Sequence, residues 1–107
     1  YELAIATRDP RTASRAVPLL RHVISHFPAG YARTHALNMT ELAGAHALAG
    51  DVDTAVSVGH QAVDAGTGLS SQRVHIGLRK LHSVLEPMHP SPGVAELRER
   101  LAATAAG

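Results

Sequence analysis

The feature that most constrains the fold of this chain is the turn Ala49-Gly50-Asp51, with small residues on both sides of it. In residues 36–66 (ALNMTELAGAHALAGDVDTAVSVGHQAVDAG), apolar residues recur at helical spacing before and after this turn. Gly commonly follows the last turn of a helix, and Asp is a good N-cap for the next one. Because a short turn makes two helices antiparallel neighbours, residues 36–66 predict a helical hairpin that is closely packed through alanines and glycines.

The rest of the chain repeats this pattern of helical segments and short breaks. A short helical piece is expected at 1–7, followed by helices at about 10–27, 31–49, 52–65, 71–86 and from 92 toward the C-terminus. Pro18 lies inside the second segment, where it removes one backbone hydrogen bond and predicts a kink. No alternation of polar and apolar residues runs past a few positions, so no strand is expected. The predicted fold class is all-α: antiparallel helical hairpins, about five helices, stacked as an α-solenoid fragment.

Composition narrows the possible functions. Hydrophobic residues make up 45% of the 107 residues but aromatic residues only 3%, so the core must consist of Ala, Leu, Val and Ile. The net charge is +1 and no basic patch is visible, which argues against direct contact with nucleic acid. The absence of Cys excludes disulfides and thiolate nucleophiles and favours a cytoplasmic location. No apolar run approaches the roughly 20 residues of a membrane-spanning helix, so no membrane partner is expected.

Residues 36–66 carry a resemblance to a known repeat. When Ala55 is placed at the repeat's characteristic small position, Met39, Leu42, Ala43 and His46 fall on the four signature positions of the first helix. Leu42 and Ala43 match the usual residues, whereas Met39 and His46 replace a Trp and a Tyr. This segment resembles one tetratricopeptide repeat of about 34 residues. The resemblance implies a scaffold that binds partners or supports a neighbouring domain.

Three short motifs carry a narrower resemblance: Ala49-Gly50-Asp51, Ser71-Gln72-Arg73 and Val94-Ala95-Glu96-Leu97. With them, the stretch from about Tyr31 to Leu101 resembles the C-terminal region of actinobacterial (Streptomyces-type) helix-turn-helix transcription regulators. This implies that residues 1–107 are a single tetratricopeptide-like domain, the C-terminal fragment of a longer protein. Its implied role is to receive a protein, peptide or small-molecule signal, or to mediate dimerisation. The alternative is a repeat module of a signalling adaptor or signalling ATPase with no DNA-binding role.

The residue types of catalytic and metal sites do not converge in this sequence. His22 and His26 have a spacing that can bind zinc, but the spacing places no third ligand beside them. His46 lies on a packed face and is expected to be a hydrogen-bonded core residue. No Ser has a nearby His with an orienting acid, and no glycine-rich loop leads into Lys-Ser or Lys-Thr. The predicted protein is not an enzyme and has no catalytic residue, cofactor or metal.

A partner groove is expected on the face formed by the first helix of each hairpin. The repeat register places Leu37, Thr40, Gly44 and Leu48 there, and His75 and His82 follow on a later helix as further groove residues or pH-sensitive contacts. These positions lack the Lys and Asn residues of repeats that clamp a peptide carboxylate. A partner helix or strand, or packing onto further repeats, therefore fits better. Self-association through the N-terminal helices is also expected.

Overall fold

The computed structural model describes residues 1–26 and 31–106, and in this part of the chain every regular element is an α-helix. The helices are α1 (Glu2–Thr7), α2 (Pro10–His26), α3 (Ala32–Leu48), α4 (Val52–Gly66), α5 (Gln72–Leu85) and α6 (Pro92–Ala106). The predicted all-α class is therefore confirmed, and α3 to α5 begin and end within one residue of the predicted bounds. α2 continues through Pro18 as one helix. The expected helix end at Pro28-Ala29-Gly30 lies outside the described residues.

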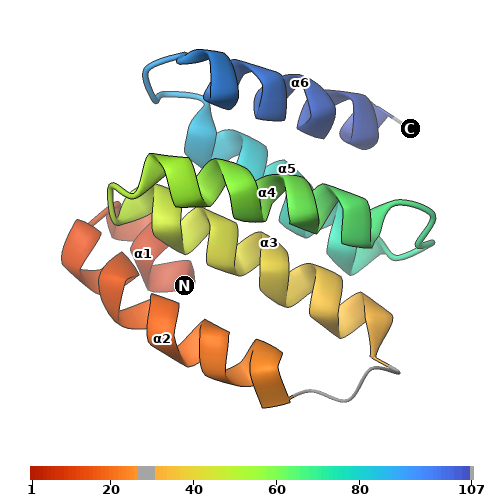
Figure 1. Cartoon of the computed structure of the whole chain (residues 1–107), viewed down its shortest axis with the longest axis horizontal. Helices are drawn as coiled ribbons and strands as arrows, with labels where there is room; N and C mark the ends of the chain where they lie inside the picture. The colour runs from red at the N-terminus through yellow and green to blue at the C-terminus, as the bar shows by residue number, and fades with distance from the viewer. Residues whose placement is uncertain (27–30, 107) are drawn as a thin grey trace.

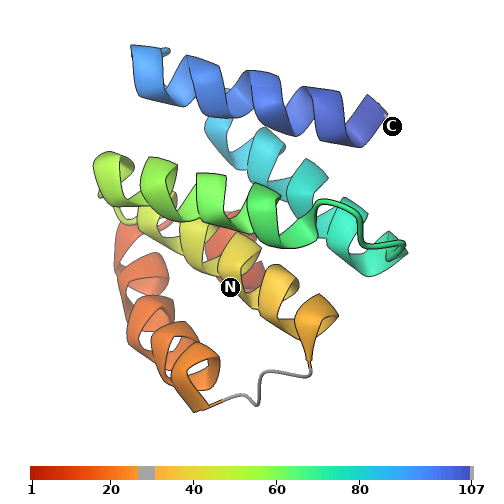
Figure 2. The ribbon, with the colours of Figure 1, turned by 45° about the vertical axis from the view of Figure 1, so that its right-hand side comes forward.

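The helices form three consecutive hairpins, α1–α2, α3–α4 and α5–α6. In Figure 1 they stack from α2 at the bottom to α6 at the top, and neighbouring helices of each hairpin run in opposite directions. The first helices of the hairpins contact one another in the series α1–α3–α5, and α4 contacts α6. Figure 2, turned by 45°, shows the same order of the stack. The arrangement is the predicted stack of hairpins.

The turn between α3 and α4 has the geometry that its sequence predicts. Gly50 adopts a φ of +93°, a conformation that is strained for residues with a side chain. This allows the Gly50 N–H to donate to the Ala47 carbonyl at 3.1 Å and the Asp51 N–H to donate to the His46 carbonyl at 2.9 Å. Asp51 then caps α4, because its carboxylate accepts a hydrogen bond from the Thr54 N–H. Two consecutive residues thus end one helix and begin the next.

Helix α3 is the centre of the fold. It contacts α1, α2, α4 and α5, and all of its last ten residues, Met39 to Leu48, are buried except Glu41. A helix that is buried on all sides needs small residues where several neighbours approach closely. Ala36, Ala43, Ala45 and Ala47 meet this need, with exposed fractions between 0 and 3%. The predicted packed stripe of α3 is therefore correct but incomplete, since the opposite face is buried as well.

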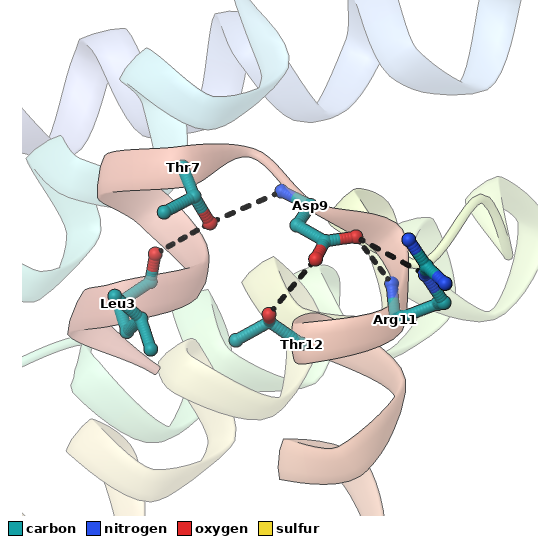
Figure 3. A network of polar contacts seen from close by, with 5 residues as sticks. All are labelled: Leu3, Thr7, Asp9, Arg11 and Thr12. Atoms are coloured by element: carbon teal, nitrogen blue, oxygen red, sulfur yellow. Dashed lines mark hydrogen bonds and ion pairs between the residues drawn. The ribbon is translucent and has the colours of Figure 1, made fainter.

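The corner between α1 and α2 is held by a local polar network and by one distant contact. Figure 3 shows the Asp9 carboxylate accepting from the Arg11 N–H at 3.0 Å and from the Thr12 hydroxyl at 3.2 Å, as an N-cap of α2 does. Thr7 donates its hydroxyl to the Leu3 carbonyl and accepts from the Asp9 N–H. The Arg8 guanidinium donates to the Val84 carbonyl, in the last turn of α5, at 3.0 Å. This contact joins the first hairpin to the third.

Helix α6 closes the stack against α4 and α5. Its apolar residues Val94, Leu97 and Leu101 are fully buried. The Arg100 guanidinium donates to the Asp64 carboxylate at 2.7 Å and lies 2.8 Å from Nδ1 of His60, which joins α6 to α4. None of the helices in the described part of the chain is both long enough and apolar enough to cross a membrane.

Candidate functional site

The first helices of the three hairpins enclose a groove, which we call the α1–α3–α5 groove. One cavity of about 190 Å³ is lined by Tyr1, Glu2, Leu37, Thr40, Glu41, Arg73, Ile76, Gly77 and Lys80. A second cavity of about 290 Å³ is lined by Arg33, Thr34, Leu37, Ser71, Arg73 and Val74. Both cavities share the lining residues Leu37 and Arg73, so they lie next to each other between α3 and α5. Concave surfaces that combine apolar and charged side chains are the usual places for partner binding.

The floor of the groove depends on Gly77. A Cβ at this position would lie 3.0 Å from Cδ1 of Leu37 and 3.6 Å from Cγ2 of Thr40, so α5 approaches α3 closely there. Ile76, beside it, leaves 39% of its surface exposed, which is unusual for a large aliphatic side chain. Leu37 and Ile76 thus form an apolar centre on an otherwise polar surface.

Tyr1 fills the groove next to Gly44. A Cβ at Gly44 would overlap the Tyr1 hydroxyl and lie 2.7 Å from Cζ, so the ring occupies the space that the missing side chain leaves. The Tyr1 hydroxyl is buried and has no hydrogen-bond partner among the described residues. Burial raises the pKa of this phenol, and the negative charges of Glu41 and Glu2 raise it further. The α1 end of the groove is therefore already occupied by a side chain of this chain.

Charged groups flank the apolar centre. Burial raises the pKa of the half-buried Glu41 carboxyl, an effect that nearby positive charges, including Lys80 and Arg73, partly offset. Lys80 donates to the Glu2 carboxylate at 2.8 Å. Both partners of this ion pair are largely exposed, so it contributes little to stability. The α1 end of the groove thus carries both acidic side chains, Glu2 and Glu41, and basic ones, Lys80 and Arg73.

The structure places the predicted groove residues in different environments. Leu37 and Thr40 line the groove, and Leu37 is only half-buried. Gly44 and Leu48 are corrections to the predicted groove: Tyr1 covers Gly44, and Leu48, 6% exposed, belongs to the core. The reason is that other helices surround the second half of α3, so a face that one hairpin alone would expose is covered there.

His75 and His82 also lie away from the groove. His82 lines a separate shallow cavity on the α6 side of α5, with Ala95, Arg98, Glu99 and Ala102. On an α-helix, residues two positions apart are rotated by about 200°. Because Arg73 lies on the groove face of α5, His75 points away from that face, and it is half-buried.

The groove residues that the sequence interpretation missed lie on α5. Arg73, Ile76, Gly77 and Lys80 follow Leu37, Thr40, Glu41 and Gly44 at a constant offset of 36 residues, which the printed numbers show. These spacings are helical, so both sets lie on one face of their helices. The offset differs from the roughly 34 residues of the repeat that the sequence resembles, so the sequence interpretation did not locate these residues.

His46 is the buried histidine of the described core, with 4% of its surface exposed. Its Nε2 lies 3.3 Å from the Arg21 guanidinium, and its Nδ1 lies 3.6 Å from the Asp51 carboxylate. Since Arg21 can only donate, Nε2 must accept, and the ring proton lies on Nδ1 toward Asp51. The prediction of a hydrogen-bonded core histidine is confirmed. Burial lowers its pKa, and the charge of Arg21 lowers it further, against a smaller effect of Asp51.

His22 and His26 stack on each other on the exposed side of α2. Their ring centroids are 4.1 Å apart, and Nδ1 of His26 lies 2.8 Å from the His22 carbonyl oxygen. Nowhere in residues 1–26 and 31–106 do three His, Asp or Glu side chains come together in a way that could hold a metal ion.

Comparison of the chain with protein families, curated proteins and solved structures gives no match.

Proposed function

We propose that this domain is a protein-interaction scaffold that binds a segment of a partner protein in the α1–α3–α5 groove. The observation that carries this proposal is the position of the two neighbouring cavities, which lie between α3 and α5 and share the lining residues Leu37 and Arg73. An exposed apolar centre, formed by Leu37 and Ile76, lies between charged residues. An apolar centre gives binding energy, and surrounding charges give orientation and specificity.

The kind of protein to which this domain belongs is proposed from the resemblances in the sequence. We propose that the domain is the tetratricopeptide-like, signal-receiving or dimerisation part of a bacterial transcription regulator, located in the cytoplasm and without catalytic activity. The alternative, a repeat module of a signalling adaptor or signalling ATPase, uses the same groove. A helix-turn-helix domain in the same protein would support the first, and a nucleotide-binding loop would support the second.

The groove proposal is tested by selecting random peptides displayed on phage against the whole 107-residue chain. Affinities of the selected peptides are then measured for the wild type, for Ile76→Asp, and for Leu19→Asp. Both substitutions replace an exposed aliphatic residue by an acid, but Leu19 lies on α2, outside the groove, and is 69% exposed. We expect binding to be lost in Ile76→Asp and kept in Leu19→Asp. Peptides that bind both variants as well as the wild type would refute the proposal.

A second surface supports self-association. Leu3 on α1 and Leu19 on α2 are large apolar side chains with exposed fractions of 64% and 69%. Exposed aliphatic side chains on the first hairpin suit a contact with another hairpin, from a second copy or from a further repeat. Sedimentation velocity of the wild type and of a Leu3→Ser/Leu19→Ser variant tests this. Self-association that weakens in the variant supports it, and a wild type that stays monomeric at high concentration contradicts it.

A further inference from the structure

The two ends of the α1–α3–α5 groove differ in the balance of their charges. At the α1 end, Lys80 is paired with Glu2, and the carboxyl of Glu41 lies in the same cavity. The other end is lined by Arg33 and Arg73, and none of the described residues that line that cavity is acidic. We call this second part of the groove the Arg33–Arg73 end.

Both arginines of this end have free guanidinium groups. Arg33 and Arg73 are exposed, and neither makes a hydrogen bond or ion pair with any residue that the structure describes. By contrast, Arg8, Arg21 and Arg100 each bind a carbonyl, a histidine or a carboxylate of this chain. Arginine presents its donors in a planar fork that matches the two oxygens of a carboxylate. The Glu41 carboxyl is near enough to Arg73 to feel its charge but makes no hydrogen bond or ion pair with it, so both guanidinium groups can bind a further acidic group.

The distance to the apolar centre defines the ligand further. Ile76 follows Arg73 by three residues on α5, which corresponds to about 4.5 Å along the helix axis. One or two residues of extended peptide, at about 3.3 Å each, span this distance. A side chain on Leu37 and Ile76 and a carboxylate on Arg73 can thus belong to one short segment.

We infer that the groove binds a segment of a partner protein in which an aspartate or glutamate stands one or two positions from an aliphatic or aromatic residue. The carboxylate binds Arg33 and Arg73, and the apolar side chain packs on Leu37 and Ile76. Nucleic acid fits less well, because a run of phosphates leaving the Arg33–Arg73 end would meet the carboxyls of Glu41 and Glu2. The inference rests on the proposed function and specifies its ligand.

The test uses the peptides selected by phage display against the 107-residue chain, each made also with its acidic residue replaced by the matching amide. Affinities of both forms are measured for the wild type, for Arg73→Gln and for Arg79→Gln, which changes an exposed arginine of the same helix outside the groove. A charge-assisted contact predicts a loss of about tenfold or more for Arg73→Gln or for the amide peptide. The two changes combined should lose little more than either alone, and Arg79→Gln should bind like the wild type.

The possible results separate this inference from the proposed function. Two results would overturn the inference and leave the groove proposal intact. In the first, the selected peptides lose affinity in Ile76→Asp but carry no acidic residue. In the second, the loss of affinity from the amide peptide adds to the loss from Arg73→Gln, so the acid does not bind Arg73. Selected peptides that bind Ile76→Asp as well as they bind the wild type would overturn both the inference and the groove proposal. A fluorescein-labelled DNA duplex is measured in parallel. If it binds the wild type, loses affinity in an Arg33→Gln/Arg73→Gln variant, and no acidic peptide is selected, the ligand is a polyanion and the inference is wrong.

Discussion

Gly59 sets the distance between α4 and α6, and the substitution Gly59→Ala tests how closely these helices pack. A Cβ at this position would overlap Cδ2 of Leu97 and lie 3.2 Å from Cδ1. Leu97 is fully buried, so moving its side chain away would press it against other core residues. Overpacking of this kind costs about 1–3 kcal/mol. Replacing Gly by Ala inside a helix contributes about 1 kcal/mol in the opposite direction, so the net change should range from nearly neutral to about 2 kcal/mol destabilising.

Gly93→Ala is the matched control, because it makes the same chemical change at the same helix pair. A Cβ at Gly93 would lie 3.5 Å from Cγ1 of Val56, which is an ordinary contact. Gly93→Ala should therefore stabilise by up to about 1 kcal/mol. The difference between the two variants isolates the overpacking cost of about 1–3 kcal/mol, and each kcal/mol shifts Tm by about 4–8 °C in a domain of this size.

The free energy of unfolding of both variants is measured by urea titration followed by far-UV circular dichroism. Gly59→Ala is also measured in a protein that carries Leu97→Ala. Leu97→Ala alone should cost about 2–5 kcal/mol, because it leaves a cavity in the core. In that background the clash is gone, and Gly59→Ala should stabilise. If Gly59→Ala stabilises the wild type as much as Gly93→Ala does, or if Leu97→Ala leaves its effect unchanged, α6 does not pack on Gly59 as described.

Three further predictions address the core, the buried histidine and metals. Ala55 is 1% exposed, so Ala55→Phe should overpack the α3–α4 contact and cost about 1–3 kcal/mol or more; an unchanged thermal melt would show that the hairpin register is wrong. Because the pKa of His46 is lowered in the folded state, the unfolded state binds its proton first, and stability should fall as the pH decreases from the ordinary value of 6.5 through the folded-state pKa. His46→Gln should reduce this dependence in urea titrations at several pH values, and an unchanged slope would contradict the assignment. Despite the eight histidines, calorimetric titration should show no stoichiometric zinc site of sub-micromolar affinity.

Most of the helices could be predicted because their ends depend on local chemistry. Asp9, Ser71 and Ser91 accept hydrogen bonds from N–H groups in the helices that follow them, and Gly50 adopts the positive φ that ends α3. These interactions involve residues two to four positions apart, so a single sequence contains all the information that they need. Pro18 was expected to kink α2 without breaking it; α2 is one helix from Pro10 to His26, and the kink stays a prediction.

The groove could be predicted only in part, since exposure depends on every neighbour of a helix. Leu37 and Thr40 line the first cavity, but Gly44 is covered by Tyr1, which is distant in sequence. Arg73 was recognised only as part of a motif. Its position opposite Leu37 follows from the contact between α3 and α5, which no local pattern specifies.

The sequence by itself determined the elements of this protein: where its helices begin and end, which of them pair across short turns, and that small residues allow them to pack closely. These properties follow from interactions within a few positions of the chain. The tertiary structure decided that the second half of α3 is buried, that Arg8 binds the end of α5, and that Arg33 and Arg73 line the same cavity. Contacts of this kind depend on the angle and distance at which hairpins stack, which many side chains determine together.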